Sequence, residues 1–379
     1  ASQTAATTRS IKASSAARIT AVIPYFPYIR SDKKDEPRPG PSGGGGVDGL
    51  LVGLGIAGAL GLIVGISYLA TRSSSTQSAT APAPQALAPL RGSATQRTSE
   101  APSPAAWAGV LGISELTWSF HQKHDAVNAA NVMDFMVRDA SNPSSIVSCL
   151  HAARENARAV RGTLTTELFE TTNQTWLEFN RMLQGDAFER DPAALFEWVK
   201  FRSHLSRGVS VGTMLQDESL HFIRIGTFLE RADNTARLLD VKFHALAGDY
   251  FGTWADDSAP EVDFYHWSAI LRSVSGFEIY RKVYRNVIRP DKVAELLILR
   301  PDMPRSLAAC MNEVMVNLDL VANEQSGETR RRAGRLRSDL QFGRIDEILA
   351  TGLHAFLTQF LDRVNDIGAG ISRDFLVPA

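Results

Sequence analysis

A chain of 379 residues, 44% of them hydrophobic and 21% charged, is long enough for one large domain with additional segments. Its formal net charge of −1 excludes a protein that binds nucleic acid through a general excess of basic residues. Its two cysteines, Cys149 and Cys310, exclude a framework of several disulfides and a zinc site built from four thiolates.

The chain begins with a basic segment, residues 1–46, which is rich in Ser, Thr and Ala. Three basic residues, Arg9, Lys12 and Arg18, precede its first acidic residue, Asp32. This composition is typical of a presequence and equally of a disordered basic leader, and the sequence leaves both open.

An apolar segment follows, and its residues 49–70 carry no charge and reach the length that a helix needs to cross a bilayer. We therefore predict a transmembrane helix over residues 47–71 and a single-pass membrane protein. A glycine-rich linker or a signal-like segment is the alternative, because glycine weakens helices. Residues 72–106 are polar and rich in Ser, Thr, Ala and Pro, which predicts a disordered linker. The apolar segment also carries a stripe of small residues, typical of membrane helices that dimerise closely: Gly49, Gly53, Ala57, Gly61 and Gly65.

From residue 107 onward the pattern is helical, with no convincing strand, and it predicts an all-α bundle over residues 107–379. The clearest helix is predicted over residues 218–247. Its apolar residues form one seam with alternating spacings of three and four, from Phe222 to Phe243. Because other faces are apolar too, we expect several charged residues of this helix to be buried and paired, with Asp233 and Arg237 one turn apart.

A second helix is predicted after Asn142, with Ser144 or Ser145 as its N-cap. It presents three arginines on one face, at positions 154, 158 and 161. Three arginines in a row require carboxylates or a bound anion opposite them.

The sequence contains an internal repeat, because residues 132–150 align without a gap with residues 293–311. Pro143 aligns with Pro304, and Cys149 aligns with Cys310. A duplicated helical unit explains the match, and it predicts that both cysteines are small core residues. Their redox state is not predicted by the sequence.

Two long motifs in this region resemble the alpha-E family, helical proteins named for a Glu-Arg pair. Residues 212–246 are similar to the family's signature helix, with Glu230 and Arg231 as the pair, and residues 142–170 are similar to its other hallmark segment. The resemblance implies a protein that acts beside ATP-grasp ligases and transglutaminase-like proteins in peptide or amide-bond formation, without established chemistry of its own. The repeat would place a first Glu-Arg helix near residue 69, so the family's opening helices are missing or replaced. The resemblance also implies a polar centre that combines both motifs: Glu230, Arg231, Asp233, Arg237, Arg154, Glu155, Asn156, Arg158 and Arg161.

A shorter segment, residues 13–38, resembles an N-terminal piece of ribose-phosphate pyrophosphokinase. Arg30 and Asp32 match a segment that helps to hold ATP in that family, whereas Ser31 replaces the usual glutamine. The metal-binding histidine and the phosphoribosyl-diphosphate loop of that family have no counterpart downstream. We interpret the chain as a mosaic of unlike segments.

Two further clusters are weaker candidates. Glu218 and His221 have the spacing of di-iron ligands, but the sequence offers no second copy, so we predict no metal and no cofactor. Arginines 330, 331, 332, 335 and 337 crowd one polar stretch, which predicts a solvated helix start or a docking site for an acidic partner.

The sequence therefore supports two functions from different classes. The first is an accessory protein that binds an ATP-grasp ligase or the peptide substrate of that ligase. The second is an enzyme in which Glu230 is the acid or base and the arginines hold an anionic substrate, with Glu230 meeting Arg158 where two helices cross. A paired polar network that only fixes the helix register, or a remnant of a pyrophosphokinase fusion, is the remaining alternative.

Overall fold

A computed structural model describes residues 104–246 and 260–376 of the chain. These residues form 15 α-helices and one 3-10 turn, and they contain no strand, as the sequence predicted. The first part comprises α3 (Pro104–Ile113), α4 (Thr117–His121), α5 (Ala129–Val137), α6 (Ile146–Ala159), η2 (Arg161–Thr163), α7 (Thr166–Gln184), α8 (Ala187–Arg190) and α9 (Pro192–Thr213).

The second part begins with the longest helix, α10 (Glu218–Leu246). It continues with α11 (Pro260–Ser273), α12 (Phe277–Tyr284), α13 (Pro290–Ile298), α14 (Leu307–Leu320), α15 (Gly327–Phe342), α16 (Ile345–Thr351) and α17 (Leu353–Leu376). The bounds of α10 agree with the helix predicted over residues 218–247 to within one residue.

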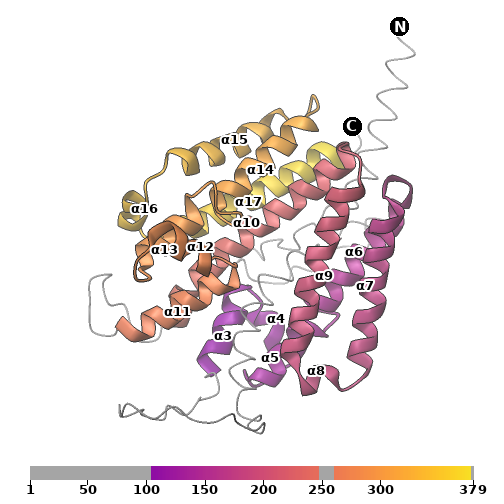
Figure 1. The fold of residues 1–379 in the computed structure, drawn as a ribbon, viewed down its shortest axis with the longest axis horizontal. Helices are drawn as coiled ribbons and strands as arrows, with labels where there is room; N and C mark the ends of the chain where they lie inside the picture. The colour runs from indigo at the N-terminus through magenta and orange to yellow at the C-terminus, as the bar shows by residue number, and fades with distance from the viewer. Residues whose placement is uncertain (1–103, 247–259, 377–379) are drawn as a thin grey trace, which may run out of the picture.

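Helix α10 runs through the middle of the bundle (Figure 1). It packs along α14, α17 and α3, and it also contacts α13. The helices α6, α7 and α9 form a separate group beside it, joined by contacts of α7 with α6 and with α9. A side chain in the middle of α10 is therefore enclosed by elements far apart in the sequence.

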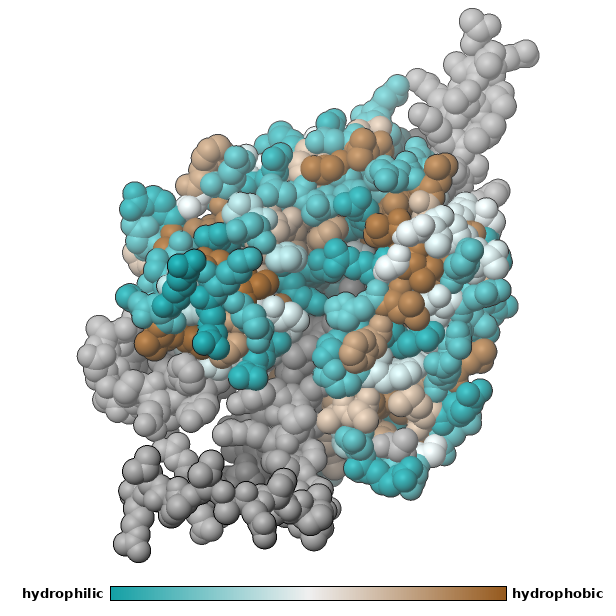
Figure 2. Space-filling model, viewed as in Figure 1, coloured by the Kyte–Doolittle hydropathy of each residue, from teal (hydrophilic) through white to brown (hydrophobic). Residues whose placement is uncertain are grey.

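The apolar seam of α10 is buried as its spacing predicted. Phe222, Ile225 and Leu239 are almost completely inaccessible, and they belong to the core that α10 shares with the second part of the chain. A second core fills the space among α3, α5 and α9 around Trp107 and Phe135. Loss of a fully buried tryptophan or phenylalanine from such a core costs about 3–5 kcal/mol. The surface in Figure 2 is mostly hydrophilic with scattered apolar patches.

Side-chain caps fix where the helices begin. The Ser145 hydroxyl accepts a hydrogen bond from the Ser148 N–H at the start of α6, so Ser145 rather than Ser144 is the cap. Ser306 caps α14 in the same way, and both helices have 14 residues. The two caps have nearly the same backbone angles, φ −68° with ψ 154° and φ −68° with ψ 155°.

The prediction of a single-pass membrane protein is corrected. Within residues 104–246 and 260–376, no helix combines the length and the apolar character that crossing a membrane requires. The predicted helix over residues 47–71, its small-residue dimer stripe, the leader 1–46 and most of the linker 72–106 lie outside the described residues.

Candidate functional site

The middle of α10 carries a cluster of charged side chains that are nearly inaccessible to solvent. Glu230 is 1% exposed, Arg231 8%, Asp233 4% and Arg237 6%. Charged side chains are rarely buried to this extent unless they are paired, because each loses its hydration. The partners of each of the four therefore decide what the cluster can do.

Asp233 and Arg237 form the ion pair that their spacing predicted. The Arg237 Nε donates to Asp233 Oδ2 at 2.8 Å, and its Nη1 donates to Glu115 Oε1 at 3.1 Å. Glu115 lies in the turn after α3, where its φ of 54° is in the left-handed region. Burial raises the pKa of Asp233, and the Arg237 guanidinium opposes that shift. The pair thus ties α10 to the turn after α3.

Glu230 breaks the expectation that every buried charge of α10 is paired. Neither of its carboxyl oxygens has a hydrogen-bond partner. Burial raises its pKa well above the ordinary range, the negative charge of Asp233 adds to the shift, and Arg231 only opposes it. The protonated, neutral form is favoured, because an isolated carboxylate is costly in such surroundings.

The two cysteines are buried core residues whose thiols feel the charges of the Glu-Arg pair. Both are free and completely buried. Burial raises the pKa of the Cys149 thiol, with a further contribution from Glu230. Burial also raises the pKa of the Cys310 thiol to about 12, and Arg231 opposes that shift. Both thiols therefore stay protonated core groups at neutral pH.

Arg231 contacts the loop that precedes α14. Its Nη1 donates to the Pro304 carbonyl oxygen at 3.4 Å, and its guanidinium lies 5.0 Å from the centre of the Phe228 ring. One turn further along α10, the Thr235 hydroxyl donates to the Arg305 carbonyl oxygen at 2.8 Å. Arg231 and Thr235 thus both bind the loop that leads into α14.

The predicted meeting of Glu230 with Arg158 is wrong. The Arg158 side chain is 56% exposed, and its Nη1 pairs with Glu155 Oε2 on its own helix at 3.1 Å. The Arg154 Nη1 pairs with Glu155 Oε1, and its Nε donates to Asn173 Oδ1 of α7, each at 2.8 Å. The carboxylate that the arginine row requires is thus mostly supplied by its own helix.

Helix geometry explains why the arginine row misses the polar centre. Residues of an α-helix are about 100° apart, so Arg158 lies about 180° around α6 from Cys149. Cys149 is completely buried, and Arg158 therefore lies on the opposite, exposed side of α6. Arg161 points outward as well, with its guanidinium 4.3 Å from the centre of the Phe169 ring. Among the α6 residues predicted for the centre, Asn156 alone is buried.

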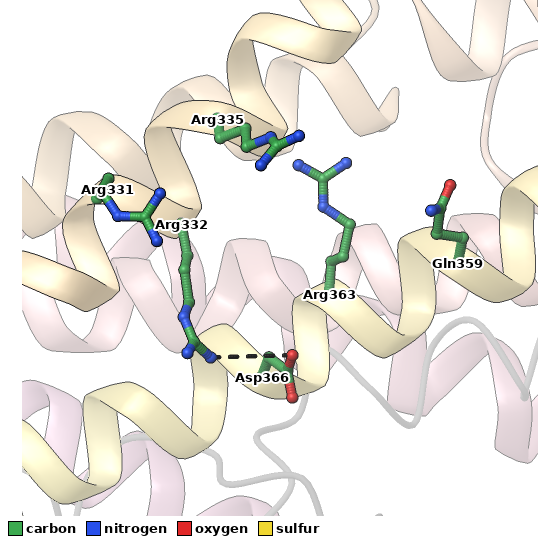
Figure 3. A pocket seen from close by; sticks show the side chains of 6 residues that line it. All are labelled: Arg331, Arg332, Arg335, Gln359, Arg363 and Asp366. Atoms are coloured by element: carbon green, nitrogen blue, oxygen red, sulfur yellow. Dashed lines mark ion pairs between the residues drawn. The ribbon is translucent and has the colours of Figure 1, made fainter.

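A second charged site lies between α15 and α17, where a surface pocket of about 390 Å³ is lined mainly by arginines. Figure 3 shows Arg335 and Arg363 pointing toward one another across it. Arg363 pairs with Asp339 at 2.6 Å, whereas Arg335 has no ion pair within the described residues. The full lining is Arg331, Arg332, Arg335, Gln359, Arg363 and Asp366.

The sequence identified three of these arginines, because they crowd one stretch of chain. It did not identify Arg363, which comes from α17 and has no basic neighbour at helical spacing. Arg330 and Arg337 do not line the pocket: Arg330 pairs with Asp319, and the Arg337 Nε donates to Asn312 at 2.7 Å. Of the three that line it, Arg331 and Arg332 share the carboxylate of Glu328.

The spacing of Glu218 and His221 does not produce a ligand cluster. The His221 Nδ1 lies 2.9 Å from Asn317 Oδ1, and the polar partner of this ring is thus an amide of α14. In the part of the chain that the structure describes, no group of three or more histidine, cysteine or acidic side chains could hold a metal ion.

Comparison with known families gives two matches. A family model described as a predicted α-helical domain with a conserved ER motif, Alpha-E, matches residues 86–376. A model of the N-terminal domain of ribose phosphate pyrophosphokinase matches residues 3–42, which lie outside the described residues. No curated protein and no solved structure matches the chain significantly.

Proposed function

The chain belongs to the alpha-E family of helical domains, and on that premise we propose that it is an accessory protein that binds an acidic partner. The partner is an ATP-grasp ligase or the peptide substrate of that ligase, as the family resemblance implies. The observation that supports a binding role is the arginine pocket between α15 and α17. A macromolecule can reach this surface pocket, whereas the Glu-Arg centre of α10 is buried.

The chemistry of the pocket favours carboxylates. Four of its six lining residues are arginines and one is an aspartate. Neighbouring carboxylates hold three of the four: Glu328 pairs with Arg331 and Arg332, and Asp339 pairs with Arg363. These contacts fix the direction of the guanidinium groups and leave Arg335 available. A planar guanidinium binds a carboxylate through two parallel hydrogen bonds, so Glu or Asp side chains of a partner fit this pocket.

The proposal is tested with a labelled oligoglutamate peptide and with an ATP-grasp ligase encoded beside an alpha-E gene. Arg335→Ala combined with Arg363→Ala should weaken binding of both by about tenfold or more, which is about 1.4 kcal/mol. Binding should also weaken as salt is added, because exposed charges are screened. Arg344→Ala is the matched control, since this exposed arginine pairs with Asp346 away from the pocket. Equal binding by the double variant and the control would overturn the proposal.

An enzyme is the second candidate function, and the state of Glu230 favours it. A buried carboxyl with a raised pKa and no hydrogen-bond partner has the properties of a general acid or base. Such a role requires the helices around α10 to open, because Glu230 is 1% exposed. If Glu230→Gln keeps the fold and the binding of the partner but abolishes a turnover measured with the neighbouring ligase, the accessory role is wrong. The pyrophosphokinase alternative predicts ATP binding by residues 1–46, and calorimetry that detects no ATP binding would dismiss it.

We also propose that the bundle arose by duplication of a helical unit. Helices α5, α6 and α7 begin 161 residues before α13, α14 and α15 respectively, as the bounds 129, 146 and 166 against 290, 307 and 327 give. The serine caps described above and the buried cysteines repeat at the same interval. A crystal structure in which the connecting loops 138–145 and 299–306 follow different paths would remove this support.

A further inference from the structure

Helix α9 presents an apolar face to solvent. It packs on α7 and on the short α8, and its buried side includes Val199, Ser203 and Ser210. On its other side Phe201 is 64% exposed and Leu205 is 45% exposed. Figure 2 shows hydrophobic side chains gathered over this helix. Monomeric proteins rarely expose large apolar residues in a continuous run, so such a face indicates a docking surface.

The exposed residues of this face follow the spacing of a coiled-coil seam. The seam consists of four exposed residues, separated by four, three and four positions: Phe201, Leu205, Gly208 and Gly212. Val211 lies beside the seam and is 64% exposed. The face therefore continues over about three turns of α9. Its shape suits a second helix that lies along it.

The two glycines of the seam have no role in the packing of a single copy of the chain. A Cβ atom added at Gly208 or at Gly212 would meet nothing within 4 Å. Glycine inside a helix is nevertheless less stable than alanine, because it loses more conformational freedom on folding. What glycine permits is the close approach of another backbone or of a large side chain. The space beside both glycines is open to an occupant from outside the copy.

The large side chains at the start of the seam are complementary in shape to the glycines at its end. Phe201 precedes Leu205 by four residues, as Gly208 precedes Gly212. When two α9 helices lie antiparallel with Leu205 opposite Gly208 of the second copy, Phe201 lies opposite its Gly212. Each large side chain then fills the space that a glycine leaves, and two-fold symmetry makes every contact twice. A second copy of the chain thus fits this face.

The charges of α9 suit an apolar occupant. Lys200 pairs with Glu197 of its own helix. The Arg202 side chain reaches α7, where its Nε donates to the Thr175 hydroxyl at 2.8 Å. The exposed Arg207 lies at the edge of the seam. A strongly acidic or basic helix would find no row of opposite charges along this face, whereas a second copy of α9 requires none.

We propose that α9 binds α9 of a second copy and forms an antiparallel dimer with two-fold symmetry. The side chains of Phe201 and Leu205 are the parts that enter the partner, and Gly208 and Gly212 are the parts that receive them. An interface of one helix on each side is small, so the dimer should dissociate in the micromolar range. The dimer shares no residue with the arginine pocket of α15 and α17, and it does not depend on the accessory role proposed above.

The test measures the mass of the full chain by sedimentation equilibrium over a series of concentrations. The wild-type protein should pass from monomer to dimer in the micromolar range. Phe201→Ser should raise the dissociation constant of the dimer by about tenfold or more, because it removes a side chain from the interface. Phe342→Ser is the matched control, since Phe342 is 77% exposed at the end of α15. A monomer at every concentration, or equal dissociation constants for the two variants, would overturn the proposal.

Gly208→Ala separates a role in docking from a role within the helix. It should raise the melting temperature of the dilute monomer, because alanine favours a helix and its Cβ has open space. The same substitution should raise the dissociation constant of the dimer by about tenfold or more, because the Cβ occupies the space of Leu205 of the second copy. If Gly208→Ala dimerises as the wild-type protein does, the glycine receives no side chain and the proposal is wrong.

Cross-linking tests the direction of the two helices. In the antiparallel pair the two copies of Leu205 are offset by three residues along the axis, whereas the two copies of Ala194 are about 37 Å apart. Leu205→Cys should therefore form a disulfide-linked dimer under mild oxidation, and Ala194→Cys should not. The native cysteines do not interfere, because both are buried. Cross-linking of both variants, as a parallel pair would give, or of neither would contradict the antiparallel dimer.

Discussion

The buried carboxyl of Glu230 predicts a specific dependence of stability on pH, which Glu230→Gln should remove. The pKa of Glu230 is raised in the folded protein, because burial disfavours its charged form. The folded state therefore holds a proton that the unfolded state releases, once the pH exceeds the ordinary glutamate pKa. In that window the stability falls as pH rises, by about 1.4 kcal/mol for each pH unit, until the pH passes the folded-state pKa.

The size of the stability difference between the wild-type protein and Glu230→Gln follows from the burial of Glu230 and from its lack of hydrogen-bond partners. Because Glu230 is 1% exposed and unpaired, no salt bridge restores the cost of ionisation. The amide of Glu230→Gln stays neutral at every pH and has nearly the same shape. Its unpaired N–H groups cost about 1–3 kcal/mol, independently of pH. The variant should thus be less stable than the wild-type protein at acidic pH, and the gap should close or reverse toward neutral pH.

Urea denaturation over a pH series from acidic to neutral measures this effect. Asp233 also has a raised pKa and contributes a slope of the same sign, but it remains in both proteins, so the difference between them isolates Glu230. Glu170→Gln is the control, because Glu170 is exposed on α7 and should leave the slope unchanged. Parallel curves for the wild-type protein and Glu230→Gln would refute the reasoning, since Glu230 would then titrate like an exposed glutamate.

Three further predictions follow from the same structure. Arg237→Ala removes the guanidinium that pairs with a buried carboxylate, and it should lower the free energy of unfolding by about 3–5 kcal/mol in urea denaturation; a loss below about 1 kcal/mol would mean that the pair is hydrated. Ser145→Ala and Ser306→Ala should each lower the free energy of unfolding by about 1 kcal/mol, because each removes the cap of a 14-residue helix. Thermal melts measure both losses, and a severalfold difference between the two losses would contradict the equivalence of the caps. Cys149 and Cys310 should react with a thiol reagent only after denaturation, because both are buried and their pKa values are raised; fast labelling of the folded protein would contradict this.

The sequence by itself predicted the parts of the structure that depend on neighbours along the chain. The extent of α10 and its buried seam follow from the spacing between Phe222 and Leu239, which is a property of one helix. The cap of α6, which the sequence placed at Ser144 or Ser145, is equally local, since the Ser145 hydroxyl binds an N–H three residues further on. The pair of Asp233 and Arg237 lies within one turn. The family was recognised for the same reason, because its motifs are continuous stretches.

The composition of the charged sites was decided by the tertiary structure. Arg158 was expected beside Glu230, but the rotation of α6 buries Cys149 and leaves Arg158 on the opposite, exposed side of the helix. Arg363 had no signal in the sequence, because α17 brings it to a pocket whose other arginines belong to α15. The rotation and the offset of one helix against another are set by packing between residues far apart in the chain. Periodicity within a single helix contains no information about that packing, so the sequence predicted which faces are charged and not which faces meet.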